Sequence, residues 1–271
     1  MNNLECKMVD VLQDLRANHN VVGIKAEFEA EGTRLEEALR LKEVVTRAGL
    51  DLTIKVGGCE ALKDMYDARS IGACRIVAPM IESAYALKKY LGAAKMVFPK
   101  EEIGQVSFLA NIETIMGFEN FDDMLKNDNI KELDGIVLGR VDMTGSLGLT
   151  REDVNSEKIF RITKELFTKA KSKGLECVIG GGVAKESLPF FQRLPKGLLD
   201  RYETRKVIFK CPESMSDDAP TGILKAVGFE LMWLKNKRNF YGSIYAEDEH
   251  RINMLEKRYK RLIEEAGVKG I

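Results

Sequence analysis

The sequence predicts an α/β fold, a (β/α)8 TIM barrel with additional C-terminal helices, and three observations support this prediction. The chain has 271 residues, 45% of them hydrophobic and 31% charged, which suffices for one large domain with a sizeable core. Short apolar runs alternate with amphipathic stretches, as in parallel sheets covered by helices. No G-x-G-x-x-G motif follows the first run, which disfavours a dinucleotide-binding fold.

Eight apolar runs are the candidate strands of this barrel. They span residues 21–28, 52–58, 74–80, 95–99, 106–114, 134–142, 177–182 and 206–212. Eight strands, each followed by a helix, account for a chain of this length. No repeat or Pro/Gly-rich linker interrupts the pattern, so we expect one barrel domain over residues 1–271.

Amphipathic stretches between the runs predict the helices. Residues 34–49 and 156–174 have apolar side chains at three- and four-residue spacing, basic residues late in each stretch and a closing glycine. After the last run, residues 221–242 and 248–267 also have the helical pattern, which is more than one barrel-closing helix. The surplus over about residues 220–271 suggests an oligomer contact, so we expect a homo-oligomer.

Charge and targeting features indicate the class of partner. Lys and Arg total 42, as do Asp and Glu, so the zero net charge favours neither nucleic acid nor an anionic membrane as a partner. The N-terminus has no signal-peptide pattern, and no stretch approaches the roughly 20 apolar residues of a membrane span. The five cysteines form no C-x-x-C pair, as is usual in a reducing compartment. We therefore expect a cytoplasmic protein with a small-molecule partner.

The residues that end the runs are the candidate site, because barrel enzymes place their reacting groups at the carboxyl ends of the strands. They are Glu27, Lys55, Met80, Glu82, Glu113, Asp142, the glycines 180–182 and Lys210.

Two carboxylates in this set suggest a metal site. Glu113 and Asp142 end neighbouring runs and would repel each other if both were ionised with nothing between them. Hard oxygen ligands without a nearby histidine suit Mg²⁺ or Mn²⁺, since His19 and His250 lie outside the set. Alternatively, Glu113 is a helix N-terminal acid and Asp142 caps a turn.

Three motifs carry a resemblance to a known family. "FLANIETIMGFENFDDML" (108–125), "DGIVLGRVDMTGSLGL" (134–149) and "IVAPMIES" (76–83) resemble segments of the HpcH/HpaI aldolase and citrate lyase β-subunit family, in the pyruvate/phosphoenolpyruvate barrel superfamily. The likeness covers about residues 20–150. It implies that Glu113 and Asp142 bind the metal.

The resemblance extends to the residues around these two carboxylates. It implies that Ser146 and Gly148 form the tight loop behind them, and it brings Glu82 and Ser83 into the substrate region.

The resemblance also implies a chemistry. A pyruvate-like 2-oxo acid would be held on the cation so that its enolate is stabilised while a carbon–carbon bond is made or broken. The chain would then be a divalent-metal-dependent aldolase or carbon–carbon lyase. The alternatives are an acyl-CoA lyase of the malyl or citramalyl type, and a catalytically altered barrel that serves as a binding or scaffold subunit.

The chain departs from the family at several of these positions. Lys55 stands where an arginine is usual, and a point charge does not replace a bidentate clamp. Lys25 and Phe28 replace an acid and a histidine or acid beside Glu27. The base is then Glu27, another carboxylate, a metal-bound water or the substrate itself, and we predict Glu27. Alternatively, Glu27 is a buried partner of Lys25 or Lys55. Arg140 would add a charge that binds a carboxylate or phosphate, or else form a structural ion pair.

Weaker features complete the predicted rim. Gly181, in "IGGGV" (179–183), belongs either to a backbone N–H nest for a substrate anion or to a tight turn. Lys210 ends the last run and is predicted to contact the substrate. Residues 200–209 are expected to lie mostly before the last strand, with Glu203 and Arg205 as a structural ion-pair cluster on the opposite face.

One mismatch concerns the strand count. The run at 21–28 aligns with the second strand of the family, so the first strand has no counterpart. Either residues 95–99 supply the missing strand, or the barrel is closed in an unusual way.

Overall fold

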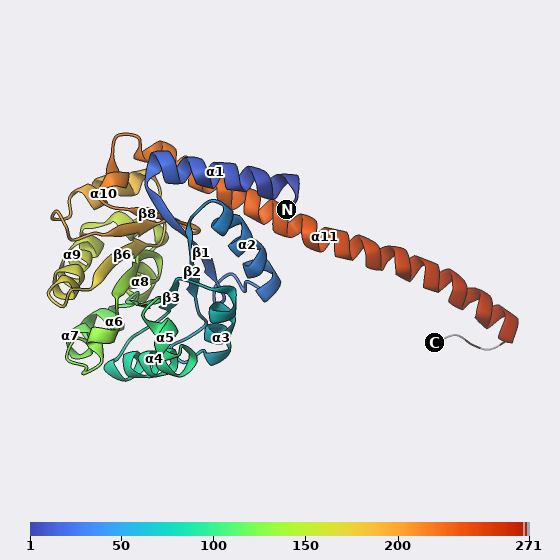
Figure 1. Ribbon diagram of the computed structural model, residues 1–271, viewed down its shortest axis with the longest axis horizontal. Helices are drawn as coiled ribbons and strands as arrows, with labels where there is room; N and C mark the ends of the chain where they lie inside the picture. Colours follow the sequence, from blue (N-terminus) through green and yellow to red (C-terminus); the bar gives the residue numbers. More distant parts are fainter. Residues whose placement is uncertain (268, 270–271) are drawn as a thin grey trace. The chain divides into compact units, whose positions relative to one another are not determined.

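A computed structural model describes residues 1–267 and 269, which fall into two compact units, Met1–Glu230 and Leu231–Ile271. The first unit contains a closed barrel in which the eight strands follow one another in chain order (Figure 1). The predicted TIM-barrel fold is therefore confirmed. The strands are β1 Val21–Glu27, β2 Asp51–Lys55, β3 Arg75–Ala78, β4 Ser107–Asn111, β5 Gly135–Gly139, β6 Glu176–Gly180, β7 Arg201–Glu203 and β8 Val207–Lys210.

The predicted strand at residues 95–99 is wrong. Most of this run lies in helix α4, Ala84–Val97, where Tyr90, Leu91, Ala94 and Val97 recur at helical spacing and are buried. A short apolar run fits a buried helix as well as a strand, so its composition did not separate the two.

The barrel is closed by a hairpin. Strands β1 to β7 pair in parallel, whereas β8 is antiparallel to both β7 and β1. The chain reverses between Thr204 and Val207: Thr204 N–H donates to the Val207 carbonyl at 2.9 Å, and Val207 N–H donates to Thr204 Oγ1 at 3.1 Å. Residues 200–206 lie before the last strand, as expected, but residues 201–203 form β7, which is parallel to β6. The expectation that Glu203 lies on the opposite face is therefore wrong, because it ends a parallel strand.

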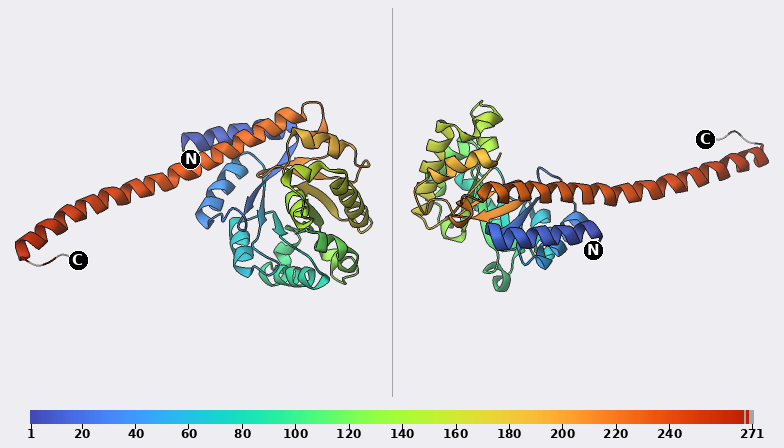
Figure 2. Two further views of the ribbon diagram at one scale, coloured as in Figure 1. Left: turned by 180° about the vertical axis from the view of Figure 1, so that it is seen from behind. Right: turned by 90° about the horizontal axis from the view of Figure 1, so that it is seen from above.

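Helices surround the barrel strands on the outside (Figure 2). They are α1 Asn3–His19, α2 Leu35–Arg47, α3 Leu62–Ile71, α4 Ala84–Val97, α5 Lys100–Ile103, α6 Ile115–Glu119, α7 Phe121–Met124, α8 Arg140–Ser146, α9 Glu157–Lys171 and α10 Leu188–Gln192. The last helix, α11 Ala219–Ala266, begins in the barrel unit and continues into the second unit. Short 3-10 turns are η1 Ile130–Glu132, η2 Arg151–Asn155, η3 Lys185–Ser187 and η4 Glu213–Met215. Among the described residues, none of the helices has the length and apolar character needed to cross a bilayer.

The two predicted C-terminal helices, 221–242 and 248–267, are one helix. Helix α11 runs without a break over 48 residues, and Gly242, the predicted end of the first helix, lies inside it. Its first residues, up to Glu230, belong to the barrel unit, and the second unit begins at Leu231.

The barrel interior is layered along the strands. Arg75, Glu176 and Arg201 begin their strands and form ion pairs, with Arg75 Nη1 lying 2.9 Å from Glu176 Oε2. A buried apolar layer follows, made of Val77, Leu109, Val137 and Val178. Charged and polar side chains then gather at the carboxyl ends of the parallel strands, so the packed core separates the two polar layers.

The hairpin predicts a stability effect. Replacing Thr204 by Val removes the acceptor of the buried Val207 N–H, so we expect the free energy of unfolding to fall by about 1–3 kcal/mol in urea denaturation. The exposed Thr168→Val in α9 is the control and should change it by less than about 0.5 kcal/mol. Equal effects of the two substitutions would show that this bond does not stabilise the closure.

Candidate active site

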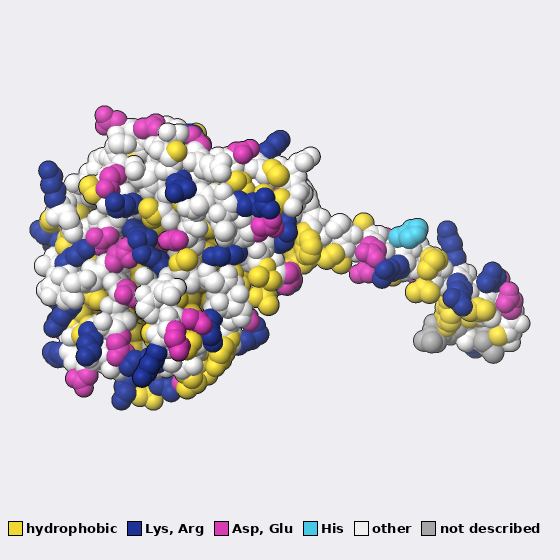
Figure 3. All heavy atoms as spheres, viewed as in Figure 1, with side chains coloured by type: hydrophobic (Ala, Val, Ile, Leu, Met, Phe, Trp, Pro, Cys, Tyr) yellow, Lys and Arg dark blue, Asp and Glu magenta, His cyan; other side chains and the backbone are white. Residues whose placement is uncertain are grey.

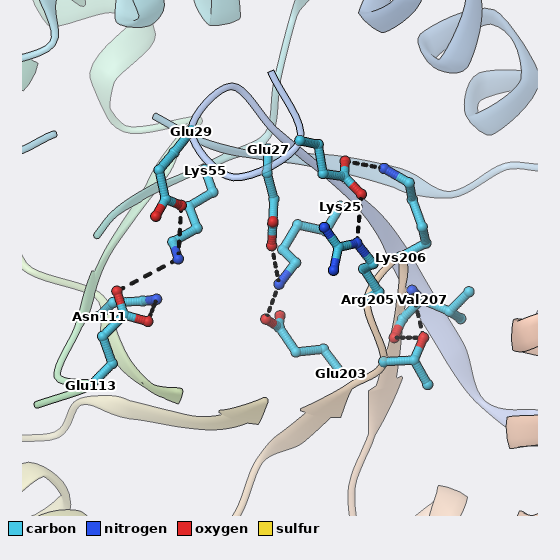
Figure 4. A network of polar contacts seen from close by, with 12 residues as sticks. Lys25, Glu27, Glu29, Lys55, Asn111, Glu113, Glu203, Arg205, Lys206 and Val207 are labelled. Atoms are coloured by element: carbon cyan, nitrogen blue, oxygen red, sulfur yellow. Dashed lines mark hydrogen bonds and ion pairs between the residues drawn. The ribbon is translucent and has the colours of Figure 1, made fainter. Parts of the chain in front are cut away.

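A first group of buried charges lies at the carboxyl ends of β1 and β7 (Figure 4). Lys25 Nζ is 3.0 Å from Glu27 Oε1 and 2.5 Å from Glu203 Oε1, and all three side chains are buried. Lys25 and Glu27 share the inner face because successive side chains on a strand alternate between faces. Glu203 arrives from the hairpin, 178 residues later in the sequence.

A second group surrounds the buried Lys55 at the end of β2 (Figure 4). Its ammonium lies 3.0 Å from Glu29 Oε2 and 3.5 Å from Glu113 Oε1. Glu113 also accepts hydrogen bonds from Asn111 Nδ2 at 2.6 Å and from Met80 N–H at 3.1 Å. Met80 adopts a left-handed backbone conformation, with φ of 50°, at the point where its N–H meets this carboxylate.

Two glycines give the carboxylates their space. A Cβ at Gly139, which ends β5, would lie 2.5 Å from Glu113 Oε2. A Cβ at Gly180, which ends β6, would lie 3.1 Å from Glu203 Oε1. The ends of these strands therefore accommodate acidic side chains that come from other strands.

The surroundings shift the pKa values of Lys25, Lys55, Glu27 and Glu113. Burial alone would lower the pKa of Lys25, but the nearby carboxylates of Glu203 and Glu27 outweigh burial, so this pKa is raised. Burial also tends to lower the pKa of Lys55, and the carboxylates of Glu113 and Glu29 raise it overall. Burial tends to raise the pKa of Glu27, but Lys25 lowers it overall. For Glu113 burial prevails over Lys55, and the charge of Asp142 adds to it, so its pKa is raised.

Asp142 lies in a short helix rather than in the predicted loop. Helix α8 begins immediately after β5, and Asp142 occupies its first turn with an exposed side chain. Ser146 Oγ, at the end of α8, accepts the N–H of Ile115 at 2.9 Å and donates to the Met143 carbonyl at 2.9 Å. Ser146 thereby connects α8 to the segment that follows Glu113.

The predicted substrate contact of Arg140 is wrong. Its side chain is fully buried, with Nε donating to the Gly180 carbonyl at 3.2 Å and Nη1 to Asn155 Oδ1 at 2.6 Å. The guanidinium also lies over the rings of Phe190 and Phe191, about 5 Å from each centroid. Protein groups occupy its donors, so Arg140 anchors α8 to the barrel rather than facing a ligand.

The predicted substrate contact of Lys210 is also wrong. Because β8 is antiparallel, Lys210 ends at the amino-terminal side of the other strands, where its N–H donates to the carbonyl of Asn20, before β1. Its exposed ammonium lies 3.2 Å from Glu213 Oε1. Glu203 ends the parallel strand β7 and therefore lies in the carboxyl-end layer, whereas Arg205 lies 3.1 Å from Glu31.

Two further predicted substrate residues have clear structural contacts. Glu82 Oε1 accepts the hydroxyl of Thr114 at 2.6 Å, which links the segments that follow β3 and β4. Gly181 has φ of 76°, and a Cβ there would lie 2.6 Å from the backbone nitrogens of Arg140 and Val141. The close approach of α8 explains this glycine, which favours the tight-turn alternative.

Sequence reasoning missed Lys25, Glu29, Asn111 and Glu203 as members of the site. The signal for Lys25 was its position two residues before Glu27 on one strand, and Asn111 stands in the same relation to Glu113. Glu203 sits in a strand of three residues, which is too short to show alternation.

Fold and site together define a TIM-barrel protein with ionisable side chains gathered where barrel enzymes carry out their chemistry. The chain belongs to the HpcH/HpaI aldolase/citrate lyase family, whose sequence profile matches residues 30–183.

Solved structures of similar fold include an HpcH/HpaI aldolase from Desulfitobacterium hafniense DCB-2, 14% identical, with 68% of this chain and 77% of that chain covered and a TM-score of 0.55. Citrate synthase SbnG is 15% identical, with 86% and 90% covered and a TM-score of 0.59. An HpcH/HpaI aldolase/citrate lyase family protein from Burkholderia cenocepacia J2315 is 12% identical, with 90% of each chain covered and a TM-score of 0.59. No curated protein matches the sequence significantly.

Removing the ammonium of Lys25 should destabilise the barrel strongly. Lys25→Met leaves Glu27 and Glu203 buried without their cation, so we expect a loss of about 3–5 kcal/mol in the free energy of unfolding. The control Lys63→Met removes an exposed lysine paired with Asp67 and should change the free energy of unfolding far less than Lys25→Met. Chemical denaturation of both variants measures the difference, and comparable losses would contradict the role of Lys25.

Glu27 also predicts a pH dependence of stability. Its pKa is lowered in the folded state, so its contribution is present above the unfolded value, near 4.5, and is lost as the pH falls through the folded value. We expect wild type to lose stability more steeply on acidification than Glu27→Gln, in denaturation curves recorded from about pH 7 to about pH 3. If the free energy of unfolding fell equally with pH in the two proteins, the result would contradict the ion pair between Glu27 and Lys25.

Proposed function

We propose that this chain is a divalent-metal-dependent carbon–carbon lyase or aldolase acting on a pyruvate-like 2-oxo acid through its enolate. The observation that carries the proposal is the position of Glu113 and Asp142 after the paired parallel strands β4 and β5, with the ammonium of Lys55 3.5 Å from Glu113. Membership in the HpcH/HpaI aldolase/citrate lyase family supports this class of chemistry.

The residues at this position fit a hard divalent cation such as Mg²⁺ or Mn²⁺. Glu113 and Asp142 offer carboxylate oxygens, and the buried Asn111 Oδ1 accepts no hydrogen bond from the described part of the chain. Gly139 lets the Glu113 carboxylate pack against the end of β5, the strand that precedes Asp142. Among the described residues, no three acidic, His or Cys side chains lie close enough to enclose an ion. A site with only two protein carboxylates suits Mg²⁺, because a protein-bound Mg²⁺ usually keeps several waters and also binds oxygens of the substrate.

Each side chain then has a role in enolate formation. The cation, when bound, would supply the positive charge that stabilises the enolate oxygen. Lys55 stays protonated because its pKa is raised, so it provides a fixed positive charge for the carboxylate of the substrate. We assign Glu27 as the base, since its lowered pKa keeps it in the ionised form that accepts a proton.

A specific observation favours a second candidate function. The Lys55 ammonium already partly neutralises Glu113, as expected if the barrel binds a ligand without catalysing a reaction. The binding or scaffold role would then keep the fold and the buried ion pairs but would not require a metal.

Exchange of the pyruvate methyl protons with D₂O distinguishes the two candidates. For protein stripped with a chelator, we expect exchange only after Mg²⁺ or Mn²⁺ is restored, because the cation stabilises the enolate. Asp142→Asn should reduce the rate by about 100-fold or more, the scale of losing a charge-stabilising group. Asp123→Asn, an exposed acid in α7, is the control and should leave the rate unchanged.

One combination of results would contradict the lyase proposal. If neither cation binds in calorimetry nor promotes exchange, and Asp142→Asn behaves as wild type, the lyase proposal fails and the binding role is favoured.

A further inference from the structure

The second unit contains the outer part of helix α11, which has a seven-residue repeat; Trp233 and Asn236 near its start are buried, and residues 242–262 are all exposed. From Leu231 to Ala266, side chains at alternating spacings of three and four form one stripe along α11. Its members are Leu231, Leu234, Arg238, Tyr241, Tyr245, Asp248, Ile252, Leu255, Tyr259 and Leu262. The leucines and the isoleucine among them are 44–54% exposed, and Figure 3 shows hydrophobic side chains along this helix.

A helix with this exposure needs a partner. Every residue from 242 to 262 is exposed, so no tertiary packing within the described chain supports this part of the helix. Isolated helices are marginal in water, because most helical stability in proteins comes from packing an apolar face. The repeat of 3.5 residues on average is the pattern by which two helices bury such a stripe against each other.

We propose that residues 231–255 of two copies of this chain pair as an antiparallel two-stranded coiled coil centred on Ser243. In this register Leu231 lies opposite Leu255 of the second copy, and Leu234 lies opposite Ile252. The remaining pairs along the seam, the line where the two stripes meet, are Arg238 with Asp248 and Tyr241 with Tyr245. Each position of the stripe therefore meets another position of the stripe.

Charge complementarity fixes the orientation. A parallel, in-register pair would place Arg238 against Arg238 and Asp248 against Asp248, and like charges in contact oppose association. The antiparallel register converts both repulsive layers into Arg–Asp pairs. The flanking Lys235 and Glu249 also become opposite partners in this orientation.

One flanking pair, Lys237 and Arg251, brings like charges together in the antiparallel register. Arg251 is already paired with Glu247 one turn earlier on its own helix, which reduces this repulsion. The Arg238 and Asp248 layers lie in the seam itself and decide the orientation.

A charge swap in the full-length chain tests both the association and its direction. Sedimentation should show a concentration-dependent dimer for wild type. Arg238→Asp alone and Asp248→Arg alone should each weaken dimerisation by at least about tenfold, since each creates two like-charge contacts. The double variant R238D/D248R should restore the dimer. Lys257→Glu, which lies off the stripe, is the control and should dimerise as wild type does.

The outcomes separate the alternatives. A wild-type protein that sediments as a monomer at all concentrations overturns the proposal, as does a dimer that neither single variant weakens. Weakening by the single variants without rescue by the double variant overturns the antiparallel register. Near-ultraviolet circular dichroism of every variant confirms that the barrel remains folded, so a loss of dimer is assigned to the helix.

Discussion

The site depends on two buried lysines, each held between two carboxylates. Lys25 lies between Glu27 and Glu203, and Lys55 lies between Glu29 and Glu113. A buried charge is tolerated only when it is well paired, so strands β1, β2 and β7 and the segment after β4 must keep their relative positions. The same pairing sets the protonation states: the lysines stay charged and Glu27 stays ionised, whereas the more deeply desolvated Glu113 has a raised pKa.

The direction of one strand decides which residues reach this layer. Glu203 lies at the carboxyl ends of the parallel strands because it ends β7, which is parallel to β6, whereas Lys210 lies at the other side because β8 is antiparallel. Glycines at the ends of β5 and β6 then admit Glu113 and Glu203. The β7–β8 hairpin that closes the barrel thus supplies a partner for Lys25.

Local patterns predicted much of the fold, and their limits explain the errors. Seven of the eight predicted strands are present, because alternating apolar runs and amphipathic helices need no long-range information. The prediction that Glu113 and Asp142 share one end of the barrel followed from their positions after neighbouring strands. Arg140 and Lys210 were misplaced because the packing of Phe190 and Phe191 and the direction of β8 depend on distant segments. The Lys25–Glu203 pair likewise joins residues that no local pattern connects.

The most direct measurement is the anomalous scattering of a crystal of the full chain soaked with Mn²⁺ and pyruvate. If Glu113 and Asp142 form a cation site, an anomalous peak will lie about 2.0–2.3 Å from an oxygen of each carboxylate, a separation typical of hard divalent cations. A map with no peak at these carboxylates, and with Lys55 still paired to Glu113, would contradict the cation site and with it the enolate chemistry.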